Sequence, residues 1–183
     1  MAEGVFQNMA SSHPLIAQID SSGTGAYHVG DTPDPRTMRT LTGHGITDYV
    51  HYAQKLDSEH FLKYDYLIAM DEWNLRDLLR ERELVRASLN KGKGPASLSR
   101  ATRGGAAAAL QADAPSTGTR LAEVRLFGDF LPGGLLHERV GGGEVVQDPY
   151  YGGPKGFETV YGQVVRFSRN FLDHVEKSQK SHG

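Results

Sequence analysis

The side chains that could do chemistry in this sequence are carboxylates, imidazoles, hydroxyls and amines, because its 183 residues include no cysteine. A thiolate is the nucleophile of cysteine-dependent enzymes and a common ligand of structural zinc. The composition therefore excludes disulfides, zinc–thiolate sites and thiol-based mechanisms for the chain as printed. No Gly-x-Gly-x-x-Gly motif follows an expected strand, so a nucleotide-binding or flavin-binding protein is the least favoured of the function classes considered. We expect no cofactor and no metal ion.

Three aspartates stand where backbone amides need a partner. Asp34 precedes a proline and Asp71 precedes an apolar helical pattern, so both are placed to cap helix N-termini. Asp148 also precedes a proline, and an Asp-Pro pair is a common way to begin a loop. Position alone therefore predicts a structural role for each of these carboxylates.

The apolar pattern predicts the elements that position these residues. Spacings of three and four predict helices over residues 2–11, from Asp34 to Gly43 or Gly45, and from Asp71 onward. Short apolar runs predict strands at 15–19, 66–70 and 124–127. We also expect a short helix over residues 57–64. The clearest helix is the last one, whose apolar stripe comprises Val160, Val164, Phe167, Phe171 and Val175. Alternating strands and helices predict an α/β fold with a parallel sheet in a single domain, residues 1–183.

Residues 90–120 depart from this pattern. They are rich in Gly, Ala, Ser and Thr and hold few large apolar residues, so they bury too little surface to offset their chain entropy. We expect a disordered, low-complexity insert. The alternative is a basic tether for acidic partners or membrane lipids. Its basic residues are scattered rather than clustered, which favours the first interpretation: Lys91, Lys93, Arg100, Arg103 and Arg120.

Bulk properties narrow the function classes. A net charge of −2 gives no support for nucleic acid as a main partner. The first six residues lack the basic and apolar regions of a signal peptide, and Ala2 stands where myristoylation needs glycine. No run approaches the roughly 20 apolar residues of a membrane span. We expect a soluble, cytoplasmic protein without a membrane span.

Four segments, in order, resemble the low-molecular-weight protein tyrosine phosphatases. They cover the chain apart from the insert and residues 131–145. The segments are Met1 to Phe6; Asp20-Ser21-Ser22-Gly23-Thr24 with its continuation to Arg36; Ala69-Met70-Asp71-Glu72; and Asp148-Pro149-Tyr150-Tyr151-Gly152-Gly153.

The resemblance implies a small doubly wound parallel sheet with helices on both faces. It also implies that the family's first, central strand and its Cys-x5-Arg-Ser-Pro phosphate loop would precede Met1. In the family's reaction the cysteine thiolate forms a phosphocysteine, while the loop amides and arginine hold the phosphate oxygens. We therefore expect the chain as given to be inactive and, with an unfilled sheet, poorly soluble or partly molten.

The resemblance also assigns roles to particular residues. Asp148 resembles the general acid that protonates the leaving phenolate. Tyr27 and Tyr150 match positions beside the substrate ring, and Tyr150 with Tyr151 resembles a pair of phosphorylation sites. Ser21, His51 and Asp71 resemble residues that support the phosphate loop, although Asp71 is expected mainly to cap its helix. For the tyrosines and His51, surface or structural roles are the alternative.

Two functional interpretations remain open at this level. One is a phosphatase that acts on phosphotyrosine proteins or small phosphomonoesters, and whose first strand and phosphate loop are missing from the sequence as given. The other is a non-catalytic short form or pseudophosphatase that acts as an interaction protein. Arsenate reduction, known in related folds, requires several thiols and is excluded for this chain.

Overall fold

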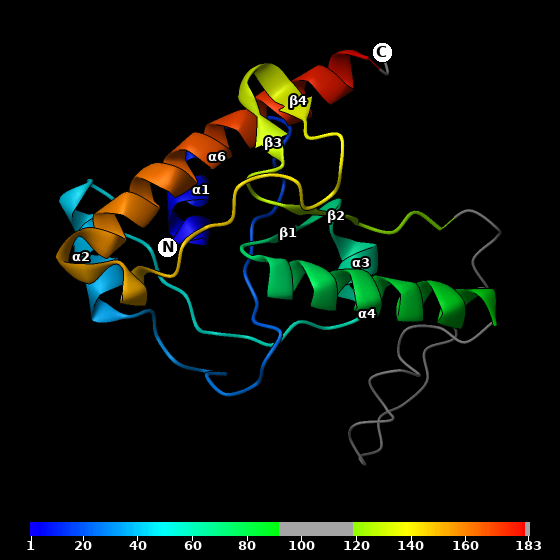
Figure 1. Cartoon of the computed structure of the whole chain (residues 1–183), viewed down its shortest axis with the longest axis horizontal. Helices are drawn as coiled ribbons and strands as arrows, with labels where there is room; N and C mark the ends of the chain where they lie inside the picture. The colour runs from blue at the N-terminus through cyan, green and yellow to red at the C-terminus, as the bar shows by residue number, and fades with distance from the viewer. Residues whose placement is uncertain (92–118, 182–183) are drawn as a thin grey trace.

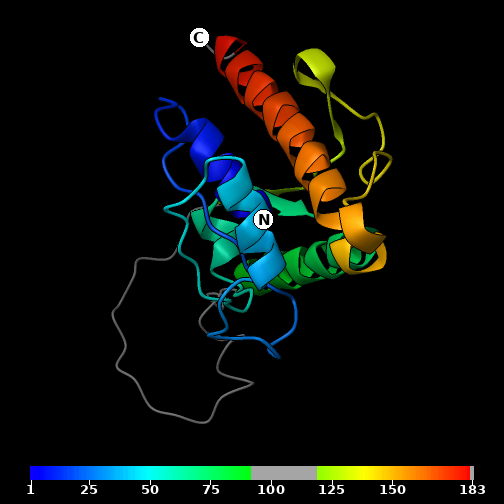
Figure 2. The same cartoon turned by 90° about the vertical axis from the view of Figure 1, so that its left-hand side faces the viewer.

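The computed structural model describes residues 1–91 and 119–181, in which helices cover both faces of a short parallel sheet (Figures 1 and 2). The run predicted as a strand at 66–70 forms β1 (Tyr66–Ala69), and the run predicted at 124–127 forms β2 (Glu123–Leu126). The two strands pair in parallel, with Tyr66 opposite Glu123 and Ala69 opposite Leu126. The α/β class predicted from the sequence is confirmed.

Successive side chains of β1 face two different hydrophobic clusters. Tyr66 and Ile68 pack on the cluster built by α1, α2 and α6, whereas Leu67 and Ala69 belong to the cluster beneath α3 and α4. This alternation follows from the two-residue period of a strand. Because both faces are covered, β1 reads as a continuous apolar run in the sequence.

Helices α1 (Ala2–Ala10), α2 (Pro35–Gly43) and α6 (Gly156–Lys180) cover the first face (Figure 2). The apolar stripe predicted for the last helix is confirmed: Val160, Val164, Phe167 and Phe171 are buried and Val175 is partly buried. Helix α2 begins as predicted, since the Asp34 side chain accepts from the amide of Arg36 and Pro35 occupies the first turn.

Helices α3 (His60–Lys63) and α4 (Glu72–Asn90) cover the second face. Leu75 and Leu78 of α4 are buried against β1 and β2, as their spacing predicts. Leu79, the next residue, is 37% exposed, because it lies past the edge of the buried face. Helix α4 continues through Asn90, and the rest of the expected insert up to residue 118 lies outside the described residues.

A buried carboxylate organises the chain after β2. Asp129 is fully buried before the hairpin of β3 (Phe130–Leu131), η1 (Pro132–Gly134) and β4 (Leu135–Leu136). Its carboxylate accepts from the amides of Leu126 (3.1 Å), Gly141 (2.8 Å) and Gly143 (2.8 Å). A Cβ at Gly143 would lie 2.1 Å from the carbonyl oxygen of Gly128, so this close approach requires glycine.

The strand predicted at residues 15–19 is wrong. The segment belongs to no sheet: Leu15 lies in a turn and is 40% exposed rather than buried, and the residues after it have no regular secondary structure. A strand needs a neighbour to bond its peptide groups, and in the described residues a cavity separates this segment from β1.

Candidate active site at the carboxyl end of the sheet

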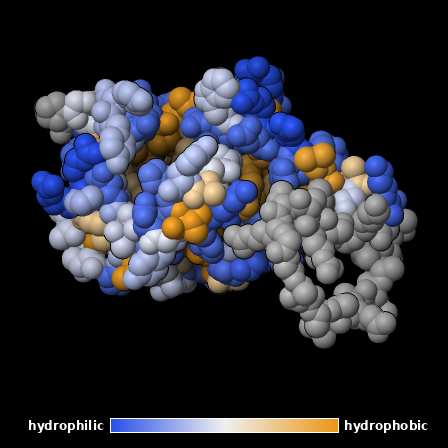
Figure 3. Space-filling model, turned by 90° about the horizontal axis from the view of Figure 1, so that it is seen from below, coloured by the Kyte–Doolittle hydropathy of each residue, from blue (hydrophilic) through white to orange (hydrophobic). Residues whose placement is uncertain are grey.

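A cavity of about 1370 Å³ lies between β1 and residues 15–20; we call it the slot. Its apolar walls come from both layers, with Phe6, Val164 and Phe171 on one side and Leu78 on the other. Seen from below, hydrophobic residues lie recessed in a hollow between hydrophilic rims (Figure 3). In parallel α/β sheets, ligands bind outside the carboxyl ends of the strands, which makes this region the candidate site.

Charges divide unevenly along the slot. Asp71 lies two residues after the end of β1. The amide of Val146 donates to the carbonyl oxygen of Met70 (2.8 Å), which brings Asp148 to the same end of the slot. The lysine and arginine among the described lining residues, Lys63 and Arg120, flank the amino ends of the two strands instead. The carboxyl end of the slot is therefore acidic.

Asp71 has the structural role that its position predicts. Its side chain accepts from the amide of Asn74 at 2.7 Å and caps α4. Removing such a cap typically costs about 1 kcal/mol. The capping bond fixes the carboxylate at the mouth of the slot, beside the end of β1.

Asp148 begins the turn η2 (Pro149–Tyr151) on the exposed rim of the slot. One carboxylate oxygen accepts from the amide of Tyr150 at 2.9 Å. In the described chain, no donor bonds to its second oxygen. The geometry leaves one oxygen of an anchored carboxylate free to give or take a proton.

Tyr150 turns away from the slot toward the start of α2. Its hydroxyl donates to Asp34, and the Arg36 guanidinium lies 4.3 Å above its ring. Arg36 donates to both oxygens of Asp34, at 3.0 and 2.9 Å. Hydrogen bonds from Arg36, and then from Tyr150, hold the pKa of Asp34 far below its usual range. The bond to Asp34 raises the pKa of Tyr150, because it stabilises the protonated phenol.

Removing the Tyr150 hydroxyl should raise the pKa of Asp34. In Tyr150→Phe the carboxylate loses one donor but keeps Arg36, so we expect an NMR-measured pKa that rises yet stays below the ordinary value. Because this pKa is depressed in the folded state, its contribution to stability is present near neutral pH and is lost as pH falls through the acid range. Tyr151→Phe, one residue away and 90% exposed, is the control and should change nothing. An unchanged Asp34 pKa in Tyr150→Phe would refute this linkage.

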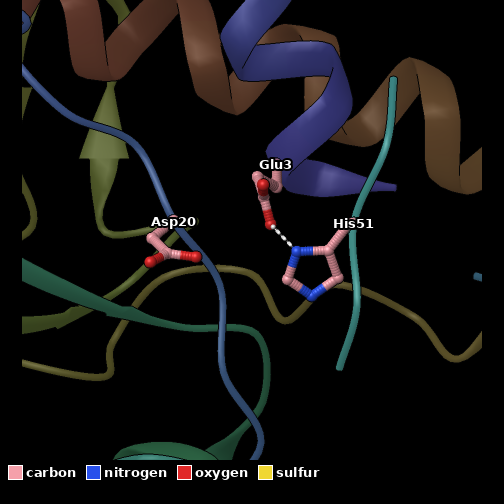
Figure 4. A group of neighbouring side chains, drawn as sticks. All are labelled: Glu3, Asp20 and His51. Atoms are coloured by element: carbon pink, nitrogen blue, oxygen red, sulfur yellow. Dashed lines mark ion pairs between the residues drawn. The ribbon is translucent and has the colours of Figure 1, made fainter. Parts of the chain in front are cut away.

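Ser21 and His51 converge on a residue that we did not predict, Glu3 of α1. His51 Nδ1 lies 3.0 Å from the Glu3 carboxylate, and the Ser21 hydroxyl donates to the same carboxylate. Figure 4 shows Glu3, Asp20 and His51 pointing toward one another from three segments. Glu3 is buried, so these partners offset the cost of removing its charge from water.

The same group is the set of described residues that could hold a metal ion. Glu3, Asp20 and His51 each offer one ligand atom, and these atoms all lie within 4.8 Å of one another. Protein donors already occupy the two carboxylates, however, since Gln54 and Tyr64 donate to Asp20. Although partial burial acts in the opposite direction, these bonds hold the pKa of Asp20 below its ordinary value. We assign no metal to this group.

Tyr27 does not join these residues. It is 95% exposed in a loop and does not line the slot. The structure thus brings Asp71 and Asp148 to one end of the slot and joins Ser21 to His51 through Glu3, while Tyr27, Tyr150 and Tyr151 lie outside its lining. One signal for Glu3 was present: Gln7, four residues later, donates to it at 2.8 Å, a spacing that puts both on one helix face.

Sequence comparison identifies relatives of the chain along nearly its whole length. The profile of the family described as "Low molecular weight phosphotyrosine protein phosphatase" matches residues 1–90. The protein of that name from Schizosaccharomyces pombe is 36% identical over 178 residues, which covers 96% of this chain and 87% of the relative. The chain belongs to the low-molecular-weight phosphotyrosine protein phosphatase family. Its human relative of the same name is 30% identical and covers 94% of this chain.

Solved structures agree with this family assignment at the level of the fold. A protein tyrosine phosphatase from Entamoeba histolytica superposes with a TM-score of 0.63, at 23% identity, over 97% of this chain and 88% of its own. Primo-1 gives a TM-score of 0.58 at 28% identity, over 93% and 86% of the two chains. The family predicted from the four sequence segments is confirmed.

In the described part of the chain, no helix is both long enough and apolar enough to cross a membrane. The helix α4 (Glu72–Asn90) has the length but is interrupted by charged residues throughout.

Proposed function

We propose that this chain is a phosphotyrosine phosphatase scaffold that carries the acid–base residue of the reaction but does not hydrolyse phosphoesters by itself. The observation that carries the proposal is the absence of cysteine from a member of a phosphatase family. The reaction that the family resemblance implies passes through a phosphocysteine, and no other residue type supplies a thiolate.

The charges of the slot support the same proposal. A phosphomonoester is a dianion at neutral pH, and phosphatases hold it with backbone amides and cationic side chains. Here Asp71 and Asp148 lie at the mouth of the slot, while Lys63 and Arg120 lie at its far end. Carboxylates next to a phosphate repel it, so the described residues do not form a phosphate site on their own.

Asp148 is proposed as the general acid. Its anchored oxygen fixes the side chain at the rim, and its second oxygen is available to protonate a leaving phenolate. Asp148 would then activate water for the second step. Ser21, His51 and Asp71 are proposed as residues that would support a phosphate-binding loop, and phosphotyrosine proteins or small phosphomonoesters as substrates of the complete site.

The tyrosines are proposed to act outside the slot. The Tyr150 hydroxyl is bonded to Asp34, whereas the Tyr151 side chain is exposed, so Tyr151 is the more accessible phosphate acceptor. Contact of Tyr27 and Tyr150 with a substrate ring would require both side chains to turn toward the slot. We propose a cytoplasmic location, on the strength of the family assignment alone.

The purified chain should not hydrolyse p-nitrophenyl phosphate or a phosphotyrosine peptide above the buffer rate, because uncatalysed phosphomonoester hydrolysis is extremely slow. The measurement is phosphate release over hours, with Asp148→Asn as the comparison; asparagine keeps an acceptor for the Tyr150 amide. Turnover by the chain that Asp148→Asn abolishes would refute the proposal and indicate a nucleophile other than sulfur.

A further inference from the structure

The solvent-facing side of α4 carries an exposed aromatic residue beside two arginines. Trp73 lies in the first turn of the helix and is 67% exposed. Arg76 and Arg80 follow it at spacings of three and four residues, which places all three side chains on one face. Leu75 and Leu78, on the other side of the helix, are buried. We call Trp73, Arg76 and Arg80 the α4 surface; none of them lines the slot.

The Arg76 guanidinium stacks on an aromatic ring and has only a weak ion pair. It lies 4.3 Å from the centroid of the Trp73 ring. Glu72, four residues earlier, stands at a favourable spacing for a helical ion pair, yet the described residues show none between the two. The nearest carboxylate is that of Asp77 at 3.8 Å, and exposed pairs of this kind contribute little. Arg76 therefore keeps donors for a carboxylate outside the chain.

Arg80 forms no hydrogen bond or ion pair with another described residue, and its side chain is exposed. Glu83, three residues later, pairs with Arg86 instead, at 2.9 Å. Arg76 and Arg80 are four residues apart, and like charges at this spacing destabilise a helix. A bound anion would remove this repulsion. The α4 surface is therefore suited to a partner that carries carboxylates.

The residue types of the α4 surface define the chemistry of that partner. A guanidinium binds a carboxylate through two parallel hydrogen bonds, and an indole offers a large apolar area. Trp and Arg are also enriched among the few residues that dominate binding energy at interfaces. The same side of the helix carries Glu72, Asp77 and Glu83, which a uniformly anionic membrane would repel. Separate carboxylates on a peptide segment fit this mixture of charges better.

We propose that the α4 surface binds an acidic segment of a partner protein, with carboxylates of the segment on Arg76 and Arg80 and an apolar side chain on Trp73. The proposal goes beyond the proposed function and does not depend on it, because binding requires neither a phosphate group nor turnover.

Trp73 provides the readout, because it is the single tryptophan of the chain. The probe is the peptide acetyl-Glu-Leu-Glu-Glu-Leu-Glu-amide, titrated into the full chain at about 0.02 M salt. We expect the tryptophan emission to move to shorter wavelength as the indole leaves water, and to saturate with a Kd of about 100 μM. Binding should weaken at about 1 M salt, where the Debye length falls to about 3 Å. A peptide with Gln in place of Glu should bind at least about tenfold more weakly.

Charge reversal locates the bound peptide. Arg80→Glu should weaken binding of the acidic peptide by at least about tenfold and should strengthen binding of a peptide with Lys in place of Glu. Arg169→Glu, at an exposed arginine of α6, is the matched control and should leave both affinities unchanged. Both variants retain Trp73, so the same emission signal measures them. Circular dichroism of each variant checks that its helices are retained.

Several outcomes would overturn the proposal. Equal binding of the Gln peptide, or an unchanged Kd in Arg80→Glu, would show that the arginines do not recognise the segment. An emission shift that appears with rising chain concentration and no peptide would assign the α4 surface to a second copy of this chain. A shift with vesicles of anionic phospholipid, but not with the peptide, would assign it to a membrane. Phosphatase turnover by the chain alone would refute the proposed function and leave these results unaffected.

Discussion

Fusing a strand and a Cys-x5-Arg-Ser-Pro loop to the amino end of this chain should convert it into an active phosphatase, with phosphotyrosine hydrolysis at least about 10⁶-fold above the uncatalysed rate. The added strand would pair with the free edge of β1 at Tyr66 and Ile68. The added cysteine would supply the nucleophile, and the arginine would place a positive charge at a mouth now lined by Asp71 and Asp148. The measurement is steady-state turnover of a phosphotyrosine peptide.

Variants of the fused protein separate the roles of its parts. Replacing the added cysteine with serine should abolish turnover, because the hydroxyl is a far weaker nucleophile at neutral pH. Asp148→Asn should lower kcat by about 10²–10⁴-fold, the usual range for a general acid, and flatten its pH dependence. Asp48→Asn, at an exposed carboxylate distant from the slot, should have no effect. A folded, active fusion that tolerates Asp148→Asn would remove Asp148 from the mechanism.

Asp129→Ala should lower the free energy of unfolding by about 3–5 kcal/mol, because it leaves one buried and two partly buried amides without their acceptor. That loss is a large share of the 5–15 kcal/mol that is typical of a domain. The affected amides are those of Leu126, Gly141 and Gly143, which join β2 to the glycine-rich loop. Urea unfolding followed by circular dichroism measures the change.

Two comparisons make the Asp129 result specific. Asp129→Asn retains one acceptor oxygen and should cost less than the alanine variant. Asp48→Ala removes an exposed carboxylate and should change the free energy of unfolding by no more than about 0.5 kcal/mol. Amide exchange at Gly141 and Gly143 should accelerate in Asp129→Ala. If the Asp129→Ala and Asp48→Ala midpoints coincide, the buried carboxylate does not hold this loop.

Local signals predicted the parts of the fold that depend on local physics. The stripe from Val160 to Phe171 fixes both the existence and the buried face of α6. Asp34 and Asp71 were recognised as caps because a side-chain acceptor before a helix satisfies amides within three residues. The strand β1 followed from a continuous apolar run, which is typical of a strand covered on both faces.

Features that depend on distant segments were not predicted. Residues 15–19 have the composition of a strand, but a strand forms only where another segment offers its peptide groups. The role of Glu3 depends on Ser21 and His51, which lie 18 and 48 residues away in the sequence. The role of Asp129 depends on the amides of two glycines that lie 12 and 14 residues after it. The turn of Tyr150 toward Asp34 joins positions 116 residues apart, which no pattern in a single sequence reveals.

Calorimetric titration of the purified chain with inorganic phosphate tests the central claim most directly, because it asks whether the scaffold holds a phosphate group without an added loop. The acidic mouth of the slot predicts no saturable binding with a Kd below about 1 mM, which corresponds to about 4 kcal/mol. The fused protein with its Cys-x5-Arg-Ser-Pro loop should bind phosphate in the same experiment. A micromolar Kd for the chain alone, lost in a variant of a residue that lines the slot, would contradict the account.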